Sequence, residues 1–343
     1  MKNDVQRVQL AHGAGGRAMT QFLEEVVFPH FHRNKCRGGI GLPEADDGAT
    51  IPLESQEVVV STDSHTVSPL FFAGGDIGRL AASGAINDVA MMGAQPLALT
   101  CALVIEEGFP IADLNRILGS MAAAADEDQV AVIAGDTKVM PKRSLDQLII
   151  CTTGIGLVPR GRAIADSGIR HEDKIIITGT VGDHGIALLA HREGLAFETT
   201  LVSDVAPIWS TVRAALEVGG IHAMKDPTRG GVAGALNELA GKSKVSLEIE
   251  EEKIPIRREV LAASQMLGLD PLHVTCEGKA ILAVDPKNAD KVLKAIRRTR
   301  YGTQAEIVGE ADAERPGLVT MRTAVGGTRV LQHPWAEAIP RVC

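Results

Sequence analysis

Several aspartates stand among small residues where strands end or helices begin. They fall in the stretches ADDGA, STDS, AINDVA, AGDTK and KDPTRGG. Clustered carboxylates repel one another unless a cation lies between them, and Mg²⁺ binds through carboxylates, water and substrate phosphates. Each aspartate alone fits a cap or a turn, but the set predicts a nucleotide–magnesium site. The candidate ligands are Asp47, Asp63, Asp88, Asp136 and Asp226, with Asn87 and Thr137 beside them.

Two further polar residues are candidates for acid–base work. Lys138 follows the GDT triplet directly, so its ammonium group could neutralise a phosphate or orient a reacting group. Glu277 precedes the apolar stretch AILAV, where partial burial would let it act as a general base. The alternatives are a surface lysine and a solvated acid, and the sequence leaves both open.

The glycine-rich stretch HGAGGRAM allows two interpretations. Its G-x-G-x-x-A pattern is not followed by a βαβ unit, which disfavours dinucleotide binding. Backbone N–H groups around Gly15 and Gly16 could close over a phosphate, or the stretch could be a plain turn.

The sequence ends on a thiol, in IPRVC. The five cysteines form no C-x-x-C pair, and Cys101 and Cys151 lie in apolar runs typical of buried positions. Cys343 instead follows a stretch with two prolines and no periodicity, which predicts a flexible tail that buries little. Such a tail could extend roughly 40 Å, so its thiol could visit two places.

These residues must be positioned by alternating strands and helices. Residues 57–62 and 96–105 read as strands, and the apolar spacing predicts helices from Asp76 and over 110–126. A polar junction near 160–173 precedes a second alternation of the same kind. The predicted fold is therefore α/β in two domains, with these divisions: a glycine-rich segment (1–42), an N-terminal domain (43–160), a C-terminal domain (168–330) and the tail (331–343).

Composition excludes several classes of function. The chain has 343 residues, a net charge of −8 and 3% aromatic residues, with no basic run, which disfavours nucleic acid as a ligand. No stretch is apolar enough to span a membrane and no signal peptide is evident, so we expect a cytoplasmic protein. Motifs of P-loop, serine-hydrolase, zinc-protease and EF-hand proteins are absent from the sequence.

The motifs, taken in order, resemble those of a known family. GAINDVAMMGA, GDTKVM, GDHGIALL, DPTRGGV, EGKA and the final PRVC are similar to those of the HypE family of hydrogenase maturation factors. The resemblance covers nearly the whole chain. It places the family beside AIR synthetase (PurM), thiamine-monophosphate kinase and selenophosphate synthetase.

The resemblance implies a fold, a reaction and partners. It implies a two-domain PurM-like homodimer, paired through a β-barrel-like interface of N-terminal sheets, with ATP and Mg²⁺ in a cleft. A HypF-type carbamoyltransferase would load Cys343, and ATP-dependent dehydration would convert the carbamoyl group to a thiocyanate. The cyanide would then pass to iron on a HypC–HypD complex for a nickel–iron hydrogenase.

The same resemblance suggests roles for single residues. It makes Cys343 the carrier, Glu277 the base and Lys138 the orienting group, and it assigns the five aspartates to Mg²⁺–ATP. Two positions depart from the family pattern, Ala85 where threonine is common and Cys276 where asparagine is frequent.

Rival interpretations explain less of the sequence. Selenophosphate synthetase would need a cysteine or selenocysteine near the glycine loop, and none is there. Another synthetase or kinase of the superfamily would leave Cys343 unexplained. A scaffold that binds ATP and docks partners without turnover remains the alternative from another class.

Overall fold

The computed structural model describes residues 8–192, 201–336, 339 and 341–343. Its N-terminal half is a five-stranded sheet in the order β1-β2-β7-β5-β6, antiparallel except for the parallel pair β5–β6. Two helices follow strands of this half, and a short hairpin precedes the first of them. The elements are β1 (Ala49–Pro52), β2 (Gln56–His65), β3 (Phe71–Phe72), β4 (Gly75–Asp76), α2 (Ile77–Met91), β5 (Gln95–Glu106), α3 (Ile111–Glu127), β6 (Ala131–Met140) and β7 (Leu148–Pro159).

The C-terminal half is a seven-stranded sheet in the order β14-β13-β10-β12-β8-β11-β9. Five helices accompany it. The elements are β8 (Lys174–Ile177), α4 (Asp183–Arg192), α5 (Trp209–Val218), β9 (Ile221–Lys225), α6 (Gly231–Ser243), β10 (Ser246–Glu250), α7 (Arg258–Leu267), β11 (Ile281–Val284), α8 (Ala289–Ile296), β12 (Glu306–Asp312), β13 (Val319–Arg322) and β14 (Thr328–Val330). Before the first sheet, residues 10–30 form short helical segments, of which α1 (Gly16–Phe22) is the longest.

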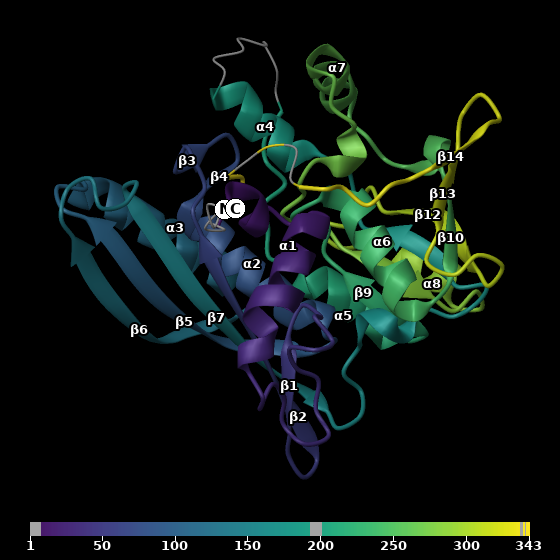
Figure 1. Ribbon diagram of the computed structural model, residues 1–343, viewed down its shortest axis with the longest axis horizontal. Coiled ribbons are helices and arrows are strands. Elements are labelled where there is room, and N and C mark those ends of the chain that lie inside the picture. Colours follow the sequence, from purple (N-terminus) through teal and green to yellow (C-terminus); the bar gives the residue numbers. More distant parts are fainter. Residues whose placement is uncertain (1–7, 193–200, 337–338, 340) are drawn as a thin grey trace, which may run out of the picture.

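These elements confirm the predicted mixed α/β fold in two halves. Asp76 caps the predicted helix α2, because its carboxylate accepts hydrogen bonds from the backbone of Gly78 (2.9 Å) and Arg79 (3.0 Å). In Figure 1 the N-terminal sheet lies at the left and the C-terminal sheet at the right, with α2 and α5 between them. No helix in the described parts of the chain is long and apolar enough to cross a membrane.

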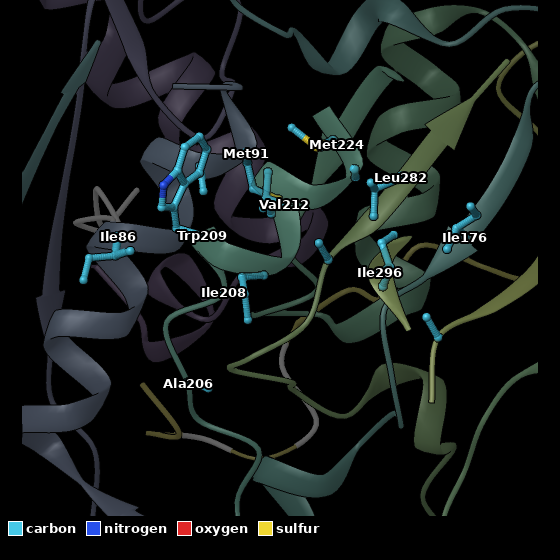
Figure 2. Packing of buried hydrophobic residues seen from close by; sticks show 14 of the residues in the cluster. Ile86, Met91, Ile176, Ala206, Ile208, Trp209, Val212, Met224, Leu282 and Ile296 are labelled. Atoms are coloured by element: carbon cyan, nitrogen blue, oxygen red, sulfur yellow. The ribbon is translucent and has the colours of Figure 1, made fainter. Parts of the chain in front are cut away.

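A single apolar core joins the two halves. Ile86 and Met91 of α2 belong to the same buried cluster as Ile176 and Leu282 of the second sheet. Figure 2 shows Trp209 and its neighbours on α5 between these two groups. Because the cluster is continuous, the relative position of the halves depends on side-chain packing as well as on the connecting chain.

Close backbone contacts determine how near α2 lies to the N-terminal sheet and to α3. A Cβ atom on Gly154 of β7 would lie 2.4 Å from the carbonyl oxygen of Ala85, and one on Gly78 would lie 2.1 Å from that of Ile117. Neither position has room for a side chain. The glycines therefore let α2 pack directly onto β7 and α3.

We expect Ile86→Ala to lower the free energy of unfolding by about 2–5 kcal/mol, because it opens a cavity in the shared core. Ile111→Ala is the matched control, since Ile111 is 74% exposed on α3 and its loss should change stability by less than about 0.5 kcal/mol. Urea denaturation measures both. Equal losses would mean that the shared core does not stabilise the protein.

Candidate active site

Four of the predicted aspartates converge between the two halves. Asp63 lies on β2, Asp88 on α2, Asp47 just before β1 and Asp226 just after β9. Burial raises the pKa of Asp88 well above its ordinary value, and the charges of Asp63, Asp226 and Asp47 raise it further. We call these four residues the acid cluster.

Local packing explains why the acid cluster forms. Ser61 of β2 donates a hydrogen bond to Asp88 Oδ2 at 2.5 Å, which fixes the carboxylate of α2 against the sheet. A Cβ atom on Gly84 would lie 3.6 Å from Asp63 Oδ2, so Asp63 points at the helix. Alternation along β2 and the close approach of α2 thus bring both carboxylates to one side of the sheet.

Two lysines form ion pairs here, Lys225 with a member of the acid cluster and Lys242 with neighbouring carboxylates; neither was among the residues predicted from the sequence. Lys225 Nζ forms ion pairs with Asp47 and, at 3.2 Å, with Asp166. Lys242 Nζ lies 2.7 Å from Asp166 and 3.1 Å from Asp46. The only sequence signal was Lys225 beside Asp226, because the partners of both lysines are distant in sequence.

Burial affects the pKa values of the acid cluster more strongly than these lysines do. Burial raises the pKa of Asp47 well above its usual range, although Lys225 opposes the effect. Burial likewise raises the pKa of Asp226 to about 6, against the opposing charge of Lys225 and with the help of Asp63. The raised pKa values favour the protonated forms of these carboxyl groups, and a cation that bound between them would displace the protons.

The acid cluster fits a hard cation in its donor chemistry. Asp47 Oδ2 and Asp226 Oδ2 are buried and accept no hydrogen bond from the described residues. Oxygen ligands of this kind suit Mg²⁺, which also takes phosphate oxygens and water. Within the described residues, however, no three metal-binding side chains already converge at coordination distance. Any cation would therefore need ligands from a nucleotide as well.

Asn87 precedes Asp88 of the acid cluster, but its side chain has a structural role. Its amide nitrogen donates to the carbonyl oxygen of Ala206 at 3.0 Å, and its amide oxygen accepts from the backbone of Ile208 at 2.9 Å. Both ends of the side chain therefore fasten α2 to the segment that begins α5. Its predicted contact with a nucleotide stays a prediction.

Glu277 is next to this fastening. The residue is 3% exposed, as the sequence had indicated, and lies in the loop before β11. Its backbone N–H donates to Asp204 Oδ1 at 3.1 Å, and its carbonyl oxygen is 3.5 Å from the amide nitrogen of Asn87. The backbone of Glu277 is thus connected to Asn87, the residue that precedes Asp88 in α2.

Asp136, Thr137 and Lys138 lie apart from the acid cluster in one protomer. They belong to β6, where every residue is exposed, and Lys138 Nζ is 3.7 Å from Asp136 Oδ2. Asp63 pairs directly with Thr152 of β7, so both side chains lie on the same face of the sheet. That face is covered by α2, because the hydroxyl of Thr152 donates to the carbonyl oxygen of Ala81. Asp136 and Lys138 pair with Ala102 and Val104 in the alternate rows, so they point to the opposite face.

The glycine-rich stretch packs against the tail. The backbone of Arg17 and Ala18 at the start of α1 donates to the carbonyl oxygens of Pro334 (3.2 Å) and Trp335 (3.1 Å). A Cβ atom on Gly15 would lie 2.7 Å from Arg229, and one on Gly16 2.5 Å from Pro334. The backbone N–H groups of Arg17 and Ala18 could bind a phosphate only if Pro334 and Trp335 moved away from them.

Cys343 lies between the two halves, on a tail that is more buried than expected. Ile339 is 4% exposed and Val342 is fully buried, which corrects the prediction that the tail buries little. The carbonyl oxygen of Cys343 accepts a hydrogen bond from the backbone of Thr66 at 3.3 Å. Thr66 follows β2 directly, so the thiol-bearing residue is hydrogen-bonded next to the end of the strand that carries Asp63.

Comparison with known protein families supports the division of the chain into two domains. Models of the N-terminal and C-terminal domains of AIR synthase related proteins match residues 45–158 and 170–321. The fold and the acid cluster therefore define a two-domain protein of the AIR synthase-related class.

Relatives that match over nearly the full length identify the family within this class. The carbamoyl dehydratase HypE of Rhizobium leguminosarum is 44% identical over 98% of this chain and 95% of its own length. The HypE–HypF complex contains a chain that is 41% identical, covers 91% of this chain and 99% of that chain, and has a TM-score of 0.85. HypE in complex with ATP is 39% identical over 98% and 100% of the two chains, with a TM-score of 0.81. The chain belongs to the HypE family of carbamoyl dehydratases.

We expect Asp226→Asn to stabilise the nucleotide-free protein at pH 8 by about 1–3 kcal/mol, because it removes a buried charge whose pKa is raised to about 6. The gain should shrink as the pH falls from 6 towards 4, where Asp226 becomes protonated in the folded protein. The same variant should lose Mg²⁺–ATP binding.

Thermal denaturation at pH 8 and pH 4.5, with calorimetric titration of Mg²⁺–ATP, checks both effects. Asp126→Asn on the exposed end of α3 is the control and should change neither. A destabilised Asp226→Asn at pH 8 would contradict the raised pKa.

Proposed function

We propose that this protein uses ATP to dehydrate a carbamoyl group carried on the thiol of Cys343, and so forms a protein thiocyanate. The single observation that carries the proposal is the position of Cys343, which lies between the halves beside the strand that bears Asp63. Family membership supports it, because relatives over the full length are named carbamoyl dehydratases. We propose a cytoplasmic location, consistent with the five free thiols.

The chemistry sets out what the site must provide. The carbamoyl oxygen attacks the γ-phosphorus of ATP, ADP leaves, and the oxygen becomes part of a phosphate leaving group. The nitrogen loses two protons in all, the C–O bond breaks, and the products are phosphate and S–C≡N. A base must accept the protons, and bulk water must be kept from the activated carbon.

The chain's own residues divide this work. Cys343 holds the carbamoyl group, and its partly buried side chain packs against two buried apolar clusters, which limit its contact with water. Glu277 is buried, its backbone contacts the side chain of Asn87, and it is our candidate for the base. Asp47, Asp63, Asp88 and Asp226 would hold Mg²⁺, which when bound neutralises the phosphate charges of ATP. ATP itself is proposed here because a relative of known structure is described in complex with it.

Lys138 and Asp136 enter this scheme through a second copy of the chain. β6 forms the outer edge of its sheet, and Val132, Ile133 and Val139 are between 48% and 65% exposed. An apolar edge of this kind is normally covered by a partner. We propose that two copies pair at β6, and that Lys138 then orients the carboxamide and Asp136 contributes to the Mg²⁺–ATP site across the pair.

The remaining partners are those that would deliver the carbamoyl group and accept the cyanide. The relative crystallised in the HypE–HypF complex supports a HypF-type carbamoyltransferase as the enzyme that loads Cys343. We propose a HypC–HypD complex as the acceptor of the cyanide, which becomes a ligand of the hydrogenase iron.

We expect carbamoylated protein to gain about 43 Da on Cys343 and to lose about 18 Da when ATP and Mg²⁺ are added. Intact-mass spectrometry follows both steps, and Cys343→Ser should show neither while still binding nucleotide. A loaded chain that binds ATP but keeps its full mass would favour the scaffold over the dehydratase.

We expect the double variant Ile133→Glu, Val139→Glu to elute as a monomer of 36.2 kDa, because charges on β6 prevent close pairing of two edges. Light scattering after size exclusion measures the mass, and the unaltered chain should show twice that value. Leu261→Glu, on α7 and also partly exposed, is the control. An unaltered chain that is monomeric would rule out the pairing.

A further inference from the structure

The last residues of the chain are held by hydrogen bonds to residues 66–68. The backbone of Ser68 donates to the carbonyl oxygen of Arg341 at 3.2 Å, and Thr66 donates to that of Cys343 at 3.3 Å. Arg341 Nε returns a hydrogen bond to the carbonyl oxygen of Thr66 at 3.2 Å. These hydrogen bonds run antiparallel between residues 66–68 and the end of the chain, although Arg341 itself has a left-handed backbone with φ of 58°. In Figure 1 the C label lies between the two halves, below α4.

The side chain between these hydrogen bonds is fully enclosed. Val342 has no exposed surface and packs in a cluster with Ile186 of α4, Val260 of α7 and Val274. A backbone pair at the protein surface would need no such pocket. The contact with the tail therefore involves a buried side chain as well as backbone hydrogen bonds.

His184 holds the one tail carbonyl that faces this interior. Its ring Nε2 lies 2.7 Å from the carbonyl oxygen of Val342, and its Nδ1 lies 2.7 Å from the hydroxyl of Ser203. A carbonyl can only accept, so Nε2 carries the proton and Nδ1 accepts from Ser203. The ring is fully buried, and burial lowers the pKa of His184, which keeps the ring neutral.

The segment that orients His184 also contacts the loop of Glu277, the proposed base. Ser203 Oγ also accepts from the backbone of Val205 at 3.1 Å, so its hydroxyl is fixed in direction. The next residue, Asp204, accepts from the backbone N–H of Glu277 at 3.1 Å. Adjacent residues of one segment thus orient the histidine that binds the tail and the loop that bears Glu277.

We propose that Thr66, Ser68 and His184 form a tail seat, and that the hydrogen bond from His184 to Val342 decides whether Cys343 is placed for dehydration or released for loading. The proposal rests on the proposed function and names a positioning residue for it. A separate carbamoyltransferase must reach the thiol, which requires Val342 to leave its pocket. Dehydration instead requires the thiol to stay between the apolar clusters, away from water.

The tail seat should therefore shift two reactions in opposite directions. Without the His184 donor, the buried carbonyl of Val342 loses its hydrogen bond and the seated state loses about a factor of ten in population. The thiol would be more often exposed to reagents and to the loading enzyme. Conversion of an already loaded tail would slow by a similar factor.

The experiment compares His184→Leu with His184→Gln and His191→Leu in the full-length protein. Glutamine can present an amide N–H near the position of Nε2, whereas leucine cannot. His191 lies on the same helix but is exposed, so its replacement is a matched control. Circular dichroism and thermal denaturation establish that each variant is folded.

The first readout is the rate of alkylation of Cys343 by iodoacetamide, measured on the peptide 338–343 after cleavage at Glu337. We expect an increase of about tenfold in His184→Leu, a smaller one in His184→Gln and none in His191→Leu. The second readout is single-turnover loss of water from the carbamoylated protein, which should slow in the same order, while loading by the carbamoyltransferase does not slow.

An unchanged alkylation rate in folded His184→Leu would overturn the tail seat. If that variant fails to fold, Val342→Asp tests the same seat from the tail side, because its charge cannot enter the pocket; an unaltered alkylation rate there overturns the proposal equally. Alkylation needs neither carbamoyl groups nor ATP. Faster alkylation without any dehydration in the parent protein would keep the tail seat and reject the proposed function.

Discussion

Repulsion among the buried carboxylates of the acid cluster is the interaction on which the arrangement of the protein depends. Asp88 and Asp226 come from different halves, and burial together with neighbouring charge raises the pKa of both. Left to electrostatics, the halves would move apart in the absence of a cation. The continuous core through α5, the ion pairs of Lys225 and the amide of Asn87 oppose this separation. The protein thus keeps an electrostatically unfavourable site assembled by packing elsewhere, which leaves the site ready for a metal–nucleotide complex.

The sequence was sufficient for those parts of the structure that depend on local pattern. Apolar spacing predicted α2, α3 and the main strands, and a one-sided burial pattern is clear in α3, β2 and β7. It also selected the acid cluster, since carboxylates among small residues at element ends need either a cap or a cation. Asp76 shows the limit of that reasoning: it has the same context and is only a helix cap.

The sequence was insufficient where a contact joins distant residues or where a strand changes register. The pairing of β5 with β6 is irregular between Leu99 and Thr100, so one residue of β6 is skipped. A skip of one residue exchanges the two faces of a strand, and Asp136 and Lys138 consequently point away from Asp63. The tail shows the other limit. Its prolines and lack of periodicity indicated a free tether, but its burial depends on His184 and Thr66, which no local pattern connects with Val342.

The buried tail also explains why one residue can serve two enzymes. Besides the backbone hydrogen bonds, the enclosed Val342 and the ring of His184, the seat of Cys343 depends on contacts of charged side chains at the surface, in which Arg341 pairs with Asp146 and Arg192 donates to the carbonyl oxygen of Arg341. A larger interface would hold the thiol more firmly but would close it to the loading enzyme, because a state that is rarely left is rarely available to a partner. A smaller one would leave the activated carbamoyl group in water. The modest size of the seat therefore follows from the two reactions that share Cys343, and the apolar surroundings of the thiol supply for a moment the dry environment that the dehydration needs.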